Sequence, residues 1–156
     1  MKTTARAVVI GGGVVGVSTL YHLAKMGWSD VVLLERKELT SGSTWHAAGL
    51  LPLFNLSYSV GKLHQYSVAL YPSLEAETGL HAGLSQVTNI RLATTKDRMD
   101  EYHYYAGVAR TIGVDVNFLT PGQVKDIWPL ANMDGVIGAI QHPDDGYIQP
   151  ADLTQA

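Results

Sequence analysis

The sequence predicts an α/β fold, in which a parallel βαβ unit opens the chain and a mixed α+β region follows it. Residues 7–10 form a wholly apolar run that ends in glycines, which is typical of a central strand in a parallel sheet. A helical period begins at Val14, and Gly27 stands where it would end that helix. A second apolar run over residues 31–35 supplies the next strand, so strand, glycine turn, helix and strand make one βαβ unit.

The composition is that of a globular protein and argues against several classes of partner. The chain has 156 residues, of which 46% are hydrophobic and 16% charged, enough for one full domain. A formal charge of -3 without a basic block argues against nucleic acid and anionic membranes as partners. No apolar stretch reaches the roughly 18 residues of a membrane span. The absence of cysteine excludes disulfides and thiolate metal sites. It suits a cytoplasmic protein, or a mitochondrial matrix protein whose leader has been removed.

The remaining elements follow from periodicity and from capping residues. Residues 40–51 are rich in Ser, Thr, Gly and Ala, which predicts a turn that feeds a short helix. Pro72 lies inside a helical pattern and should kink or split that helix. Thr120 and Gln123 have the spacing of a capping box, and Asp152 has the position of an N-cap. The expected helices span residues 62–77 and 96–112 and begin again at residue 121, and the expected strands span residues 86–93, 114–119 and 136–141.

Too few residues follow Asp152 to bury a helical face, so the chain is expected to be the front part of a longer protein.

The turn after the first strand carries a motif for phosphate binding. Residues 11–16 match G-x-G-x-x-G. In that motif Gly11 allows a tight turn, Gly13 lets backbone amides approach a diphosphate, and Gly16 lets the helix pack close to the sheet. The helix start offers free N–H groups and a partial positive charge to phosphates. Glu35 follows at the spacing of about 20 residues at which an acid reaches a ribose hydroxyl. Its carboxylate disfavours a 2′-phosphate and therefore NADP, which leaves FAD or NAD.

The segment after Glu35 carries a resemblance to a known family. Glu35-Arg36 and the run Leu39-Thr-Ser-Gly-Ser-Thr-Trp-His-Ala-Ala-Gly-Leu50 resemble the flavin-dependent amine oxidoreductases of the D-amino-acid-oxidase superfamily, and dimethylglycine and sarcosine dehydrogenases most of all. Residues 74–79, 91–94 and 145–153 agree, so the resemblance covers the whole chain and the N-terminal part of much longer proteins. It implies a Rossmann-like FAD-binding domain followed by part of an α+β substrate domain. The expected boundaries are residues 1–80 for the FAD-binding part, 81–145 for the substrate part and 146–156 for a return toward the FAD domain.

The resemblance also assigns site residues. In that family a histidine in this segment is joined covalently to the flavin 8α-methyl carbon, and His46 has its position. The residues implied to line the cofactor are Gly42, Ser43, Thr44, Ala47, Ala48, Gly49 and Leu50, and those implied to contact its adenosine and pyrophosphate side are Val14, Val15, Glu35 and Arg36. From the residues alone, the preferred interpretation of His46 is a partly buried histidine beside Trp45 that is hydrogen-bonded to backbone. The other five histidines lack metal-ligand spacing and are expected at the surface or on helix faces, so no metal is expected.

The activity that the resemblance implies is oxidation of an N-methylated glycine by hydride transfer to the flavin. The product iminium would be hydrolysed or captured by a folate, and an electron-transfer protein or oxygen would reoxidise the flavin. No catalytic base is assigned within the chain, and the isolated 156-residue chain is expected to be inactive. Two alternatives stay open. One is a non-catalytic regulatory subunit of a phosphatase, against which His46 argues. The other is a plain NAD-binding module, which gives no reason for residues 42–49.

Overall fold

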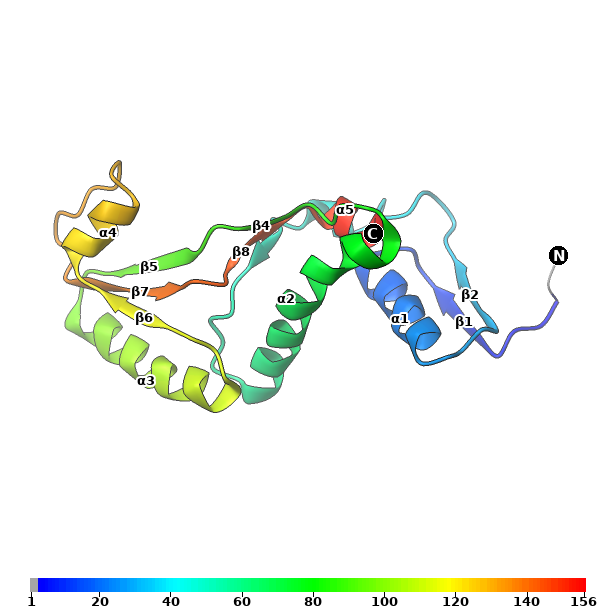
Figure 1. Cartoon of the computed structure of the whole chain (residues 1–156), viewed down its shortest axis with the longest axis horizontal. Coiled ribbons are helices and arrows are strands. Elements are labelled where there is room, and N and C mark those ends of the chain that lie inside the picture. Colours follow the sequence, from blue (N-terminus) through cyan, green and yellow to red (C-terminus); the bar gives the residue numbers. More distant parts are fainter. Residues whose placement is uncertain (1–2) are drawn as a thin grey trace. The chain divides into compact units, whose positions relative to one another are not determined.

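The computed structural model describes residues 3–156, which divide into two compact units (Figure 1). The first unit contains residues 3–49, 71–84 and 148–156, and the second contains Leu50–Leu70 and Ser85–Tyr147. Helix α2 (Tyr58–Thr78) supplies residues to both units, and the division falls between Leu70 and Tyr71.

The first unit contains the predicted βαβ arrangement. Its elements are β1 (Ala7–Ile10), α1 (Val14–Lys25), β2 (Val31–Leu34), the 3₁₀ helix η1 (Thr44–His46) and α5 (Pro150–Gln155). Strands β1 and β2 are parallel, with Ala7 opposite Val31 and Ile10 opposite Leu34. Helix α1 packs on both strands, and α5 packs on α1 and on η1. Gly27 follows the helix with a φ of +86°, a left-handed conformation that favours glycine, as the sequence predicts.

The second unit is built on an antiparallel sheet. Strands β5 (Asn89–Ala93) and β6 (Asn117–Leu119) both pair with the central strand β7 (Gly138–His142). Helix α3 (Lys96–Ile112) runs along this sheet, and α4 (Pro121–Ile127) lies against β6 and β7 (Figure 1). A smaller sheet has the order β3-β8-β4, with β3 (Leu50–Leu51), β8 (Gly146–Ile148) and β4 (Leu84–Gln86).

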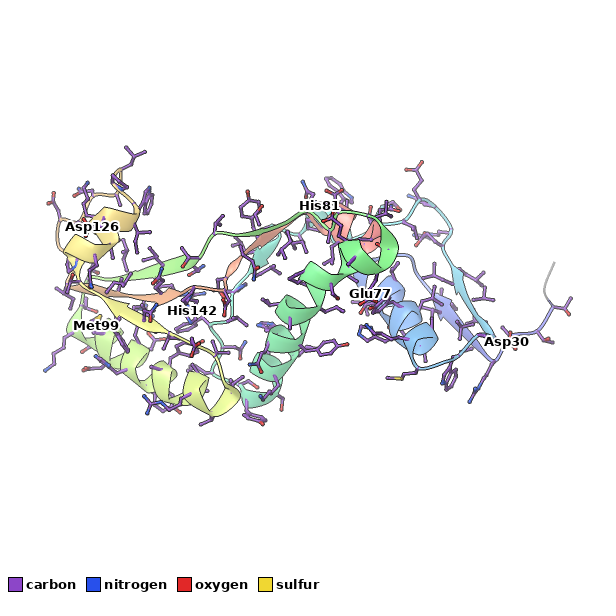
Figure 2. All side chains as sticks on the ribbon, in the orientation of Figure 1. Asp30, Glu77, His81, Met99, Asp126 and His142 are labelled. Carbon is purple, nitrogen blue, oxygen red and sulfur yellow. The ribbon has the colours of Figure 1, made fainter. Side chains whose placement is uncertain are left out.

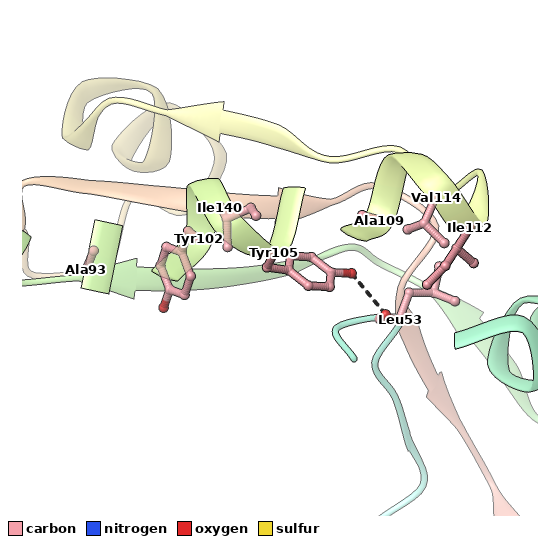
Figure 3. Packing of buried hydrophobic residues seen from close by; sticks show 8 residues of the cluster. All are labelled: Leu53, Ala93, Tyr102, Tyr105, Ala109, Ile112, Val114 and Ile140. Carbon is pink, nitrogen blue, oxygen red and sulfur yellow. Dashed lines mark hydrogen bonds between the residues drawn. The ribbon is translucent and has the colours of Figure 1, made fainter. Parts of the chain in front are cut away.

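The core of the second unit lies between α3 and the sheet (Figure 3). Tyr102, Tyr105, Ala109 and Ile112 occur at helical spacing and are all buried, so they form one face of α3. Tyr105 is the largest of the completely buried side chains on this face. The buried cluster contains Leu53, Ala93, Tyr102, Tyr105, Ala109, Ile112, Val114 and Ile140.

One histidine is buried, although the sequence predicts that it lies at the surface. His142 ends β7 (Figure 2), and it is completely buried together with Asp145. The ring Nε2 of His142 lies 3.0 Å from the hydroxyl of Tyr105, and Asp145 Oδ1 accepts the N–H of Leu53 at 2.8 Å. The expectation failed because a partner from α3 makes burial of the imidazole possible, and sequence spacing gives no sign of that partner.

Several element boundaries also differ from the expectation. Helix α2 begins one turn earlier, at Tyr58, and Pro72 does not split it. Residues 86–93 do not form one strand, because Thr88 has a φ of +69° and donates two hydrogen bonds, to the carbonyls of His142 and Asp145. Helix α5 begins after Gln149, not Asp152, with Pro150 at a position where its missing N–H is not needed.

Two features are absent from residues 3–156. Within this range no helix is long and apolar enough to cross a membrane. No group of three or more His, Asp or Glu side chains in the same range is arranged to hold a metal ion.

Candidate cofactor-binding site

Glycine is required at the start of the loop between β1 and α1 and in the first turn of α1. Gly11 has a φ of +112° and donates its N–H to the carbonyl of Leu34 at 2.8 Å. A Cβ at Gly16 would lie 1.9 Å from the carbonyl oxygen of Gly11. A larger residue at position 16 would therefore push the first turn of α1 away from the loop, as the motif predicts.

The start of α1 presents unpaired backbone donors. Within the described part of the chain, no protein acceptor bonds the N–H groups of Gly13, Val15 and Gly16. The N–H of Val14 donates to Oγ1 of Thr44 at 3.0 Å. No acidic residue lies in the first turn of α1 to offset the positive end of the helix dipole. Three amides at this end are therefore available to an anion.

Glu35 lies at this same loop. Its Oε2 accepts the N–H of Gly12 at 2.7 Å, and its Oε1 accepts the N–H of Lys37 at 2.9 Å. These bonds, the one from Gly12 first, hold the pKa of Glu35 below its ordinary value. The side chain is therefore ionised and fixed beside the loop, and each carboxylate oxygen retains a lone pair for a further donor.

Gly12 is a loop residue that the sequence reasoning did not assign. A Cβ at this position would lie 2.5 Å from Cδ2 of Leu39 and 3.1 Å from the side chain of Glu35. The carbonyl of Gly12 also accepts the N–H of Thr40 at 2.9 Å. The signal in the sequence is the middle glycine of the run Gly11 to Gly13, at a position that the G-x-G-x-x-G motif leaves unspecified.

The predicted attachment segment folds as η1 and lies against the start of α1. Thr44 is buried, with 8% of its surface exposed, because its hydroxyl accepts the N–H of Val14. His46 is exposed, and its Nδ1 lies 3.1 Å from the carbonyl oxygen of Gly42. The rings of Trp45 and His46 lie 3.8 Å apart at 33°. The interpretation of His46 from the residues alone therefore agrees with the ring beside Trp45 and its bond to backbone, but not with the exposure of the side chain.

The other predicted site residues are not all brought to this loop. Seven of them are exposed: Val15, Arg36, Gly42, Ser43, Ala47, Ala48 and Leu50. Gly49 has a φ of +72°, and a Cβ there would lie 2.0 Å from the carbonyl oxygen of Ile148, so position 49 requires glycine. Leu50 begins β3 and belongs to the second unit.

The loop fits the diphosphate of a dinucleotide such as FAD. The unpaired amides of Gly13, Val15 and Gly16 are hydrogen-bond donors, which phosphate oxygens require. A Cβ at Gly13 would lie 2.8 Å from Oγ1 of Thr44, so glycine keeps the backbone open at this point. The carboxylate of Glu35 lies at the edge of the same loop, and its oxygens are the acceptors that a ribose hydroxyl would require.

Comparison with protein families agrees with this geometry. The family model described as FAD dependent oxidoreductase (DAO) matches residues 6–156. The chain belongs to this FAD-dependent oxidoreductase family. Dimethylglycine dehydrogenase, mitochondrial, of Rattus norvegicus is 46% identical over 99% of this chain and 18% of its own length. Sarcosine dehydrogenase, mitochondrial, of Homo sapiens is 43% identical over 97% of this chain and 17% of its own length.

The chain is also similar to a solved structure and to a protein that is named as a regulatory subunit. The L-proline dehydrogenase structure from P. horikoshii is 27% identical with a TM-score of 0.90, over 99% of this chain and 41% of that one. The pyruvate dehydrogenase phosphatase regulatory subunit of Mus musculus is 38% identical over 100% of this chain and 18% of its own length. The chain thus spans about a fifth of the length of these curated relatives.

Proposed function

We propose that this chain forms the FAD-binding front of an enzyme that oxidises and demethylates an N-methylated glycine, such as dimethylglycine or sarcosine. The observation that carries the proposal is the start of α1, where three unpaired amides lie beside Glu35. The same helix start is bonded through Thr44 to the turn that carries His46. The similarity to the rat dimethylglycine and human sarcosine dehydrogenases supports this class of substrate.

Each part of the proposed cofactor has its own residues. The amides of Gly13, Val15 and Gly16 would bind the diphosphate, and Glu35 would accept a ribose hydroxyl. A ribose 2′-phosphate would be repelled by the ionised Glu35, which favours FAD over NADP. The remaining proposed contacts are Gly11, Val14 and Arg36 on the adenosine and pyrophosphate side, and Gly42, Ser43, Thr44, Ala47, Ala48, Gly49 and Leu50 along the flavin.

His46 is the proposed point of covalent attachment, and its hydrogen bond indicates which nitrogen reacts. The carbonyl of Gly42 can only accept, so Nδ1 of His46 carries the proton and Nε2 carries the lone pair. Nε2 would supply the electron pair for a bond to the flavin 8α carbon. The flavin would supply the electrophilic 8α carbon for this bond, which would replace one C8α–H bond, and it would serve as the two-electron acceptor. The carbonyl of Gly42 would stabilise positive charge on the alkylated ring.

FAD, when bound, would supply the acceptor for a hydride from the N-methyl carbon of the amine, and the iminium product would be hydrolysed by water or captured by a folate. An electron-transfer protein or oxygen would then reoxidise the cofactor. No residue from 3 to 156 is assigned to amine binding or proton transfer.

The location and the domain boundaries are proposed from the relatives. Both dehydrogenases are named as mitochondrial proteins, which supports the matrix as the location of this protein. The domain boundaries at residues 80 and 145 are proposed from the resemblance to this family.

The alternative functions make different demands on the same residues. A plain NAD-binding module accounts for the loop and Glu35, but it needs no hydrogen bond between Val14 and the His46 turn. A non-catalytic regulatory subunit is supported by the similarity to the mouse phosphatase subunit, but it needs no reactive Nε2. Covalent flavin therefore separates the proposed enzyme from both alternatives.

The test uses the protein at its natural length. After denaturation in acid, flavin fluorescence should stay with the wild-type polypeptide and should be lost from His46→Ala. Sarcosine or dimethylglycine, added without oxygen, should bleach the flavin absorbance of the folded wild-type protein. Free flavin in both proteins would remove the covalent assignment and leave FAD binding intact. A protein that carries flavin but is not bleached by either amine would favour the regulatory subunit.

A further inference from the structure

Two hydrogen bonds tie the segment that carries His46 to the glycine loop. Oγ1 of Thr44 accepts the N–H of Val14 at 3.0 Å, and the carbonyl of Gly12 accepts the N–H of Thr40 at 2.9 Å. Both bonds lie within the first unit. Of the two acceptors, Thr44 lies within η1, two residues before His46.

The 3₁₀ turn transmits the position of Thr44 to His46. The N–H of His46 donates to the carbonyl of Ser43, and the N–H of Ala47 donates to the carbonyl of Thr44, both at 3.2 Å. These bonds close the turn on either side of His46. A displacement of Thr44 therefore moves the backbone on which the imidazole is carried.

The hydroxyl of Thr44 has a proton left to donate. Its oxygen accepts from Val14, and within residues 3–156 its hydrogen has no acceptor. A hydroxyl can accept and donate at the same time. Oγ1 lies so close to Gly13 that a Cβ there would be 2.8 Å away, which places the hydroxyl directly beside the unpaired amides. An anion bound on those amides would receive this proton as well.

We propose that Thr44 is a positioning residue that makes flavin attachment at His46 depend on the diphosphate held at the start of α1. Its hydroxyl bridges the Val14 amide and a phosphate oxygen, so diphosphate binding fixes the turn that carries the imidazole. The inference rests on the proposed function, because it takes His46 to be the attachment residue.

The test measures attachment instead of turnover. FAD is added to the flavin-free protein at its natural length, and polypeptide-bound flavin is followed after acid denaturation. Thr44→Val keeps the side-chain shape but removes the hydroxyl, and it should slow attachment roughly five- to tenfold. Thr44→Ser restores the hydroxyl and should attach flavin at close to the wild-type rate. Ser41→Ala is the matched control, because Ser41 is exposed in the same segment and is outside the proposed contacts.

A second variant breaks the bond from the other side. Gly13 is extended, with φ of -84° and ψ of 175°, which is a conformation that a following proline accepts. Proline is also favoured as the first residue of a helix, so Val14→Pro keeps α1 but cannot donate to Thr44. It should slow attachment as Thr44→Val does. The double variant should be no slower than the slower single variant, because both changes remove one interaction.

The outcomes separate this inference from the function on which it rests. Attachment at the wild-type rate in Thr44→Val or in Val14→Pro overturns the positioning role, while His46 remains the attachment residue. Equal slowing in Thr44→Ser and Thr44→Val also overturns it, because the hydroxyl would then be irrelevant. Bound flavin that survives in His46→Ala, or is absent from the wild type, overturns the proposed attachment itself.

Discussion

Glu35 is bonded to the glycine loop itself, because its Oε2 accepts the N–H of Gly12 at 2.7 Å. The bond spans 23 positions of sequence and connects the end of β2 to the turn after β1. Together with the bond from Lys37, it lowers the pKa of Glu35. Glu35 therefore has two roles in the proposed site, as the acceptor for ribose and as a support for the loop that binds the diphosphate.

Replacement of Glu35 by alanine should weaken FAD binding by more than the loss of the ribose contact alone would. Glu35→Ala leaves the Gly12 amide unsatisfied and removes the ribose acceptor, so the Kd for FAD should rise at least about tenfold. Glu35→Gln keeps one acceptor oxygen and should cause a smaller rise. Quenching of flavin fluorescence by the flavin-free protein measures both values. The exposed Glu38→Gln variant is the control, and equal affinities in Glu35→Ala and Glu38→Gln would contradict the prediction.

A methyl group at Gly16 should destabilise the protein. The added Cβ would lie 1.9 Å from the carbonyl of Gly11, and backbone cannot move aside as a flexible side chain does. Gly16→Ala should lower the free energy of unfolding by about 3 kcal/mol. Gly107→Ala is the matched control, since its Cβ would meet nothing within 4 Å inside helix α3, and it should stabilise by roughly 0.5–1 kcal/mol. A harmless Gly16→Ala in denaturant unfolding would refute the close approach.

His142 and Asp145 form a buried pair whose protons can be placed from their bonds. The hydroxyl of Tyr105 donates to the carbonyl of Leu53 at 3.0 Å, so its oxygen must accept from Nε2–H of His142. Nδ1 of His142 then has a lone pair that faces Oδ2 of Asp145 at 3.9 Å. Burial, together with Arg91, lowers the pKa of His142 to about 4. Burial raises the pKa of Asp145 to about 6, despite the bond from Leu53 and the charge of Arg91.

These two shifts should nearly cancel in the pH dependence of stability. At pH 5 the unfolded pair holds its one proton on His142, whereas the folded pair holds one proton on Asp145. Because the folded and unfolded states bind equal numbers of protons, the pair adds little slope between about pH 4 and pH 6.

Removal of either side chain of the pair should reveal the pH dependence of stability that the other side chain contributes. In His142→Gln the raised pKa of Asp145 remains. Stability is then fully present below the unfolded pKa of about 4, and up to about 3 kcal/mol is lost as the pH rises to about 6. In Asp145→Asn the lowered pKa of His142 remains. The stability present above the unfolded pKa of about 6.5 is then lost as the pH falls to about 4. Urea unfolding across pH 4–7 measures these slopes, with the exposed Asp134→Asn as control. Slopes of the same sign in both variants would contradict the assignment.

Sequence reasoning succeeded where the structure is determined by neighbours along the chain. Gly11, Gly16 and Gly27 are needed by local backbone geometry, and the capping box of Thr120 and Gln123 forms with both of its hydrogen bonds. Such features are set by residues a few positions apart, which a pattern can reveal.

The features that were missed depend on contacts between distant residues. The bonds of Glu35 to Gly12 and of Thr44 to Val14 span 23 and 30 positions, and neither has a periodic signal. The burial of His142 depends on a tyrosine 37 positions away. A polar residue on a strand is usually exposed, and only the packing of α3 on β7 makes this one an exception.

Tyr105 should be far more sensitive to loss of its hydroxyl than its neighbour Tyr104. The Tyr105 hydroxyl is buried, donates to the carbonyl of Leu53 and accepts from His142, whereas Tyr104 is 68% exposed. Tyr105→Phe leaves both buried partners unsatisfied and should lower the free energy of unfolding by about 2–3 kcal/mol, while Tyr104→Phe should change it by less than about 0.5 kcal/mol. Burial raises the pKa of Tyr105 to about 12, so its hydroxyl keeps this proton throughout the pH range of the experiment. Both variants keep the ring and its packing area, so the difference between them reports the hydrogen bonds alone. Equal stability of the two variants would mean that the network does not hold Leu53.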